Sequence, residues 1–244
     1  MNKFITTVTD LNVDAVKGLF ENTKWAGWAE PTGKNALHYL CGVPVGDDKE
    51  RATRSLVIAK MLIEGGIDIN SVHNIPDDGG IFPATPLWYA YTRGRNERLY
   101  RYLLVHGAKP DNCWWAMAWY DDVEAAELFL SHGAKLDKKL LDNIFVTTIY
   151  GKKFKFAWWA LGRGADVDAF APQGVNALMI AVKRKDDELI EKLVSLGASP
   201  DAKNPDGESA RSIAEKRGPK RLLRALADRG YEGSETSRKD RLRG

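Results

Sequence analysis

Two stretches decide the fold: Gly164-Ala165-Asp166-Val167-Asp168 and Gly197-Ala198-Ser199-Pro200-Asp201. In each, a glycine follows an apolar run and is itself followed four residues later by aspartate. The same spacing, ending in Asp or Asn, recurs after Gly66, Gly107 and Gly133. Such a recurrence means that one structural unit is used repeatedly. Stacked units build extended surfaces more readily than catalytic pockets.

Each block between these glycines has the features of two short helices. One block opens with Thr85-Pro86-Leu87-Trp88-Tyr89-Ala90, in which Thr85 can cap a first helix. Pro86 then occupies the first helical position, where its missing N–H costs nothing. A later block carries a second helix whose apolar face is formed by Leu189, Ile190, Leu193 and Val194. Glycine after such a helix adopts positive φ and ends it.

This arrangement resembles the ankyrin-repeat family. The segment from Thr85 to Ala90 is similar to the family's Thr-Pro-Leu-His-x-Ala signature, with Trp88 in place of histidine. The segment Asn35-Ala36-Leu37-His38 keeps the histidine, and the last step between glycines equals the family's period of about 33 residues. The resemblance implies an all-α solenoid of stacked helix-turn-helix units with turn or hairpin fingers.

The resemblance covers residues 1–230, which we expect to form one ankyrin-repeat domain. A capping unit is expected at 2–30, with its inward face formed by Val13, Val16, Leu19 and Phe20. Repeats are expected at 33–70, 80–111, 112–137, 140–168, 173–201 and 205–230, the last with a second helix at 221–226. Extra residues at 43–52 and a longer turn at 71–83 depart from the pattern, and the third repeat is expected to begin without a finger. The polar tail 231–244 is expected to be flexible.

The composition is that of an ordinary globular chain. Of 244 residues, 44% are hydrophobic, and the net charge of +3 is too small to imply nucleic acid by itself. No stretch approaches the roughly 18 apolar residues of a membrane helix, and the first residues do not resemble a signal peptide. We therefore expect a cytoplasmic protein without a membrane segment. Cys41 and Cys113 lack a CxxC or Cys-His companion and are expected to be small core residues.

No motif for catalysis or phosphate binding occurs. We therefore expect no catalytic residue, metal, cofactor or small-molecule substrate. The resemblance implies that His38 ties neighbouring repeats by hydrogen bonds. An enzyme would have to use the two long loops, whose candidate groups are Asp47, Asp48, His73, Asp77 and Asp78.

The resemblance also indicates a binding surface. In the family, the variable residues that end each first helix line a concave groove. Counting from the glycines, these residues are Arg93, Arg95, Trp119, Tyr120, Tyr150, Lys152, Lys153, Lys183, Arg184, Lys216 and Arg217. A basic line with an aromatic centre would steer an acidic partner and anchor it with rings. The alternative is a set of solvated helix ends, where cations suit the helix dipole.

Tryptophan is abundant, and the alignment assigns its positions. It places Trp88 and Trp115 at the signature histidine position, and Trp114 and Trp159 at buried positions. Trp158 falls on a solvent-facing position of a second helix. Trp25 and Trp28 fall in the first finger, and irregular packing could bury any of these rings.

These features favour a protein–protein interaction module that is a monomer when unbound. It would bind one specific protein partner as an inhibitor, an immunity-type protein or an adaptor. The alternatives are a host-directed effector and a nucleic-acid-associated binder that uses the basic edge and the tail.

Overall fold

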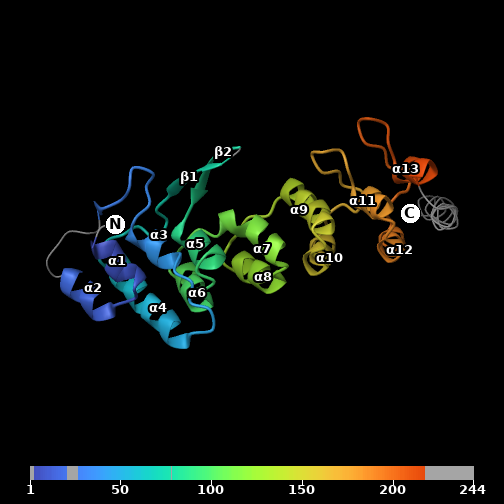
Figure 1. Ribbon diagram of the computed structural model, residues 1–244. Helices are drawn as coiled ribbons and strands as arrows, with labels where there is room; N and C mark the ends of the chain where they lie inside the picture. The colour runs from blue at the N-terminus through green and yellow to red at the C-terminus, as the bar shows by residue number, and fades with distance from the viewer. Residues whose placement is uncertain (1–2, 21–26, 78, 218–244) are drawn as a thin grey trace, which may run out of the picture. The chain divides into compact units, whose positions relative to one another are not determined.

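The computed structural model describes residues 3–77 and 79–217, apart from 21–26 (Figure 1). The side chains of Phe20 and Arg217 also lie outside the description, as do Trp25, the expected helix at 221–226 and the tail 231–244. The chain divides into two compact units. Unit 1 is Met1–Ala116 with Glu124–Lys135, and unit 2 is Met117–Val123 with Leu136–Gly244.

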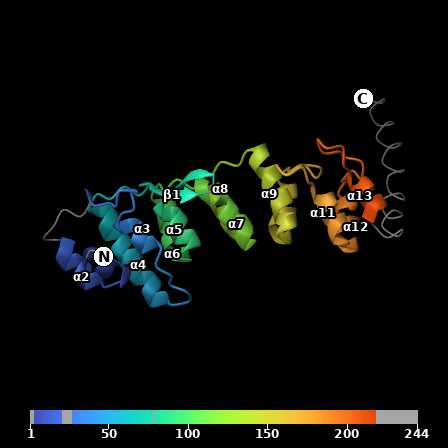
Figure 2. The same cartoon turned by 45° about the horizontal axis from the view of Figure 1, so that its top comes forward.

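Unit 1 is built from two rows of helices (Figure 2). The first-helix row is α1 (Lys3–Thr9), α3 (Ala36–Cys41) and α5 (Pro86–Thr92). The second-helix row is α2 (Val13–Phe20), α4 (Lys49–Glu64) and α6 (Glu97–Val105). Each helix contacts its own pair and the next helix of its row. After the short η2 (Asp111–Cys113) come α7 (Trp114–Tyr120), which is divided between the units, and α8 (Val123–Ser131).

Unit 2 repeats the two rows. Its first-helix row is α9 (Lys138–Tyr150), α11 (Ala177–Arg184) and α13 (Ala210–Arg217), and its second-helix row is α10 (Phe154–Gly162) and α12 (Asp187–Ser195). The helices α9 and α11 contact each other and their own pairs. The core between the rows includes Phe145, Ile149, Leu178, Met179 and Leu193. No single pair can bury its apolar side, so the stack supplies the core.

The recurring Gly-to-Asp pattern has a physical cause. All five glycines have φ between 89° and 97°, as a residue that ends a helix in the left-handed region requires. In three of the five patterns the last residue then reaches the next repeat. The side chain of Asn70 accepts the Lys109 N–H at 2.8 Å, and Asp168 accepts the Ser199 N–H at 2.8 Å. Asp111 accepts the Lys135 N–H at 3.0 Å.

One step of this ladder is made differently. Asp137 caps its own helix α9 by accepting the Leu140 N–H at 2.7 Å. Asp142, one turn further along α9, accepts the Asp166 N–H at 2.7 Å in its place. In these four steps a side-chain oxygen of one repeat, from Asn70, Asp111, Asp142 or Asp168, therefore satisfies a backbone N–H near the glycine of the next repeat.

The two departures in the first repeats are now defined. The long turn contains the antiparallel strands β1 (His73–Asp77) and β2 (Gly80–Ala84), with Ile75 opposite Phe82. This hairpin is a finger of the kind that the resemblance implies. The insertion expected at 43–52 is shorter than predicted, because Lys49 to Ala52 already form the first turn of α4. The Asp48 carboxylate caps that turn.

The helix α1 was not predicted, although its pattern is readable. Phe4, Ile5, Val8 and Leu11 are buried, with the spacing of one helical face. In α2, Val16 is buried as expected, whereas Val13 and Leu19 are half-buried. The first residues therefore complete the capping unit as a helix pair.

Candidate partner-binding surfaces

The predicted site residues lie where the first helix of each repeat turns into the second. At this corner one residue per repeat adopts left-handed φ: Arg95 (49°), Asp121 (58°), Lys152 (57°) and Lys185 (57°). After two of these corners the next residue caps the second helix: Asn96 accepts the Leu99 N–H at 3.2 Å, and Asp186 accepts the Leu189 N–H at 3.1 Å. The backbone around each corner is therefore set by the turn.

Two residues before each corner stand Arg93, Trp119, Tyr150 and Lys183, one per repeat. Trp119 is 72% exposed and Tyr150 is 66% exposed, so both rings are open to solvent. Tyr120 is also exposed. Arg93 and Arg95 belong to unit 1 and the other site residues to unit 2. That all of them form one line remains a prediction.

Lys153 can contact Trp119 because a different residue, Asp121, caps the helix α10. Lys153 occupies the capping position of α10, but its side chain accepts no hydrogen bond there. Instead the Asp121 carboxylate, from the preceding repeat, accepts the Phe156 N–H at 2.7 Å. The Lys153 ammonium lies 5.8 Å from the centroid of the Trp119 ring. The exposed tryptophan thus carries a cation from the next repeat.

Tyr150 carries a cation in the same way. The Arg184 guanidinium lies 5.0 Å from the Tyr150 ring centroid and donates to the Ile149 carbonyl at 3.1 Å and to the Tyr150 carbonyl. Both carbonyls lie at the C-terminal end of α9, where a cation is favoured, and the Ile149 carbonyl also accepts the Lys152 N–H at 3.2 Å. Arg184 is half-buried and ties α11 to α9.

The remaining lysines of unit 2 differ in their partners. Lys152 and Lys183 are exposed and form no ion pair with any residue that the structure describes. Lys216 lies 3.8 Å from Glu208, and both line a small cleft of about 210 Å³ with Lys183. The predicted Arg217 side chain lies outside the described residues.

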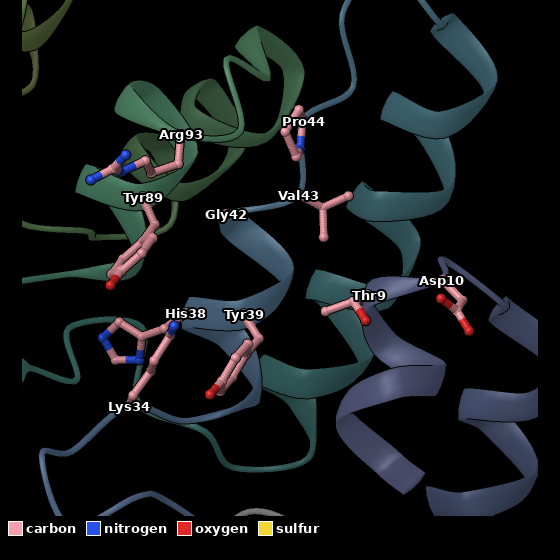
Figure 3. Close-up of a pocket in the computed structure, with 10 residues that line it drawn as sticks. All are labelled: Thr9, Asp10, Lys34, His38, Tyr39, Gly42, Val43, Pro44, Tyr89 and Arg93. Atoms are coloured by element: carbon pink, nitrogen blue, oxygen red, sulfur yellow. The ribbon is translucent and has the colours of Figure 1, made fainter. Parts of the chain in front are cut away.

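Unit 1 carries a larger cleft of about 660 Å³ that sequence reasoning missed, apart from Arg93. Figure 3 shows Lys34, Tyr39 and Tyr89 gathered in one part of it, away from Thr9 and Asp10. The cleft is lined by Thr9, Asp10, Lys34, His38, Tyr39, Gly42, Val43, Pro44, Tyr89 and Arg93. These residues come from the end of α1, from α3 and its flanking segments, and from α5 and its C-cap. A signal for it was the run of Lys34, His38 and Tyr39 around one first helix.

The cations of the cleft sit on aromatic rings. The Lys34 ammonium lies 4.0 Å from the Tyr39 ring centroid and 5.6 Å from that of Tyr89. The Arg93 guanidinium lies 5.9 Å from the Trp88 ring. Neither cation forms an ion pair with a described residue. The cleft therefore offers two positive charges beside aromatic walls, against one carboxylate from Asp10.

Two polar side chains that line the cleft, His38 and Tyr39, are neutral at physiological pH. Burial lowers the pKa of His38 to about 4, because the charged imidazole would lose its hydration. Its Nδ1 lies 3.3 Å from the Asn35 backbone N and 2.8 Å from the Asn35 Oδ1, and its Nε2 lies 3.2 Å from the Ser71 carbonyl oxygen. Burial, followed by the hydrogen bond to Glu30, raises the pKa of Tyr39 to about 12. Lys34 and Arg93 thus set the positive charge here.

The comparisons with known proteins agree with this architecture. The family model described as "Ankyrin repeat" matches residues 173–205. The human ASB11 ankyrin repeat domain superposes with a TM-score of 0.67 at 20% identity, over 94% of this chain and 98% of that chain. The chain folds as an ankyrin-repeat domain. The resemblance found in the sequence and the expected fold class are thereby confirmed.

A second ankyrin-repeat structure gives the same result. The ankyrin repeat domain of Bcl-3, described as a unique member of the IkappaB protein family, has a TM-score of 0.63 at 19% identity. It covers 93% of this chain and 98% of that chain. No curated protein matches the chain in sequence. Ankyrin repeat domains are generally protein–protein interaction modules and typically have no catalytic role.

At the signature positions of the ankyrin repeats, one prediction is met and one is corrected. His38 ties its finger to the next through Ser71, as the family resemblance implies. Trp115 was expected in that position of the third repeat but is 51% exposed, which corrects the prediction. Trp114 is buried instead and donates to the Lys135 carbonyl at 2.8 Å. Because neighbouring helical residues point about 100° apart, only one of the two rings can face inward.

Trp158 is also less exposed than predicted. It is half-buried, with its ring stacked on that of Phe154 at 6.0 Å between centroids. Lys192 of α12 lies 5.9 Å from the same ring. The neighbouring second helix therefore covers part of this solvent-facing position.

Two of the groups that an enzyme could use, Asp48 and His73, are engaged in the fold. Asp48 caps α4, and His73 Nδ1 lies 2.7 Å from the Tyr89 hydroxyl. Among the described residues, no group of three or more His, Cys, Asp or Glu side chains is placed to hold a metal ion. Within that same part of the chain, no helix has the length and apolar character needed to cross a membrane. Cys41 and Cys113 are free and buried, as expected for core thiols.

Proposed function

We propose that the chain binds one specific protein partner and acts by occupying it. The observation that carries the proposal is the repetition of Trp119 and Tyr150 at one register, both largely exposed and each with a cation of the next repeat on its ring. Tryptophan, tyrosine and arginine dominate the binding energy of many interfaces. A surface held rigid by stacked helices also loses little entropy on association.

The partner is proposed to be acidic. Lys152 and Lys183 in unit 2, and Lys34 and Arg93 in unit 1, form no ion pair with a described residue. Asp121 and Asp186 lie near the predicted site residues in the sequence. Their carboxylates accept the backbone N–H groups of Phe156 and Leu189. Unpaired cations favour association with an acidic surface and make its rate depend on salt.

An inhibitor, an immunity-type protein and an adaptor would all work by such occupancy. They differ in what happens to the partner, so the activity of the captured protein with and without the chain separates the roles. Two free, buried thiols fit a reducing compartment, and we propose that the chain is cytoplasmic.

The test is capture of a stoichiometric partner, followed by measurement of its Kd. Trp119→Ala should weaken binding at least tenfold, which corresponds to about 1.4 kcal/mol. Trp115→Ala is the matched control, because it removes another exposed tryptophan of α7 at a different register. If Trp119→Ala and Tyr150→Ala both leave the Kd unchanged, the proposed surface is wrong.

A further inference from the structure

Three exposed residues of unit 2 recur once per repeat along the stack of helices. Trp119, Tyr150 and Lys183 occupy the same register in successive repeats, and we call these three, with Lys152 and Lys153, the aromatic rail. Lys153 reaches Trp119, and Arg184 reaches Tyr150, so each step joins adjoining repeats. The helices α9 and α11 contact each other, and helices packed side by side lie about 8–10 Å apart. Tyr150 and Lys183 are therefore about 8–10 Å apart, and Trp119 occupies the same register one repeat before Tyr150.

This step can be compared with the two extended forms of a peptide. A β-strand turns successive side chains to opposite faces, so residues three apart point in opposite directions. A polyproline II helix has three residues per turn and rises about 3.1 Å per residue. Every third side chain of such a helix then points the same way, about 9.3 Å apart. Only the second form matches the step of the rail with side chains that share one face.

We infer that the aromatic rail binds an extended, acidic, proline-containing segment in the polyproline II conformation. Residues i and i+3 of the segment face Trp119 and Tyr150, and residue i+6 faces Lys183. Proline rings pack on aromatic side chains in known polyproline II grooves. Acidic residues between the prolines meet Lys152 and Lys153. This inference rests on the proposed function and names the chemistry of its partner.

The experiment uses a nine-residue peptide of three Pro-Glu-Pro units as the probe. Binding to the full chain is followed by NMR shifts of the Trp119 indole N–H and the Lys153 amide. Saturable binding is expected, at least tenfold tighter than that of three Gly-Glu-Gly units, which carry the same charge on a flexible backbone. Three Pro-Lys-Pro units should not bind. Trp119→Ala and Lys153→Gln should each weaken binding, whereas Trp115→Ala should not.

Equal binding of the glycine peptide or of the lysine peptide would overturn the inference. So would peptide binding that Trp119→Ala and Lys153→Gln leave unchanged. Tighter binding of a nine-nucleotide oligothymidine at the same resonances would also overturn it, because it would indicate nucleic acid as the ligand. A captured protein partner that depends on Trp119, with no binding of the peptide, would keep the proposed function and overturn this inference alone.

Discussion

The capping of α10 by a carboxylate from the preceding repeat gives the sharpest test of this structure. Asp121→Gly removes the only side-chain cap described for this helix, the 2.7 Å bond to the Phe156 N–H. Glycine accepts positive φ, so the corner at Asp121 stays unstrained. Loss of a helix cap costs about 1 kcal/mol, and a hydrogen bond to a charged group contributes about 1.5–3 kcal/mol. We expect α10 to lose about 1–2 kcal/mol.

Amide hydrogen exchange measures this loss of stability at the Phe156 N–H, the donor of the lost hydrogen bond. The Phe156 N–H should exchange about 5–30-fold faster in Asp121→Gly than in the unaltered chain. Lys185→Gly is the matched control, because Lys185 has the same left-handed φ one repeat later and its side chain caps nothing. It should leave exchange at Phe156 unchanged.

A second substitution can restore the cap from its usual position. Lys153→Asp, added to Asp121→Gly, places a carboxylate three residues before Phe156, where a helix cap normally lies. Exchange at Phe156 should return toward the original rate. Partner binding should still be weak, because the Lys153 contact with Trp119 is gone. Unaltered exchange in Asp121→Gly, or no recovery in the double variant, would refute this account of α10.

Three further predictions concern stability. Burial holds the pKa of His38 at about 4, below its unfolded value of 6.5, so the neutral form stabilises unit 1 fully above pH 6.5. That contribution, up to about 3 kcal/mol, is lost as the pH falls from 6.5 to 4. In urea titrations, the free energy of unfolding of His38→Gln should therefore depend less on pH over this range than that of the unaltered chain. The same pH dependence in both proteins would count against this account. Gly94→Ala places a Cβ 2.3 Å from the Cys41 carbonyl and should cost about 1–3 kcal/mol by thermal denaturation; an unchanged Tm would contradict the close approach. Leu193→Ala should cost about 2–5 kcal/mol by leaving a cavity, and Trp119→Ala less than about 0.5 kcal/mol, so similar losses would show that Trp119 is a core residue.

The sequence alone determined the repeat, its helix pairs and the exposure of Trp119 and Tyr150. These features depend on interactions within a few residues: caps such as Thr85, glycines at helix ends and the apolar face of each second helix. Such signals lie within a single repeat, and their recurrence along the chain makes them recognisable in the sequence.

Only the tertiary structure decided how one repeat meets the next. Nothing local shows that Asp121 caps α10, that Trp114 rather than Trp115 faces inward, or that Lys34 and Arg93 share a cleft. Each depends on side chains that are tens of residues apart and meet only when helices stack. The physical reason is that the neighbouring repeats supply the hydrogen-bond acceptors for a repeat's buried N–H groups and the surfaces that cover its apolar faces. In this chain these neighbouring repeats depart from the regular pattern.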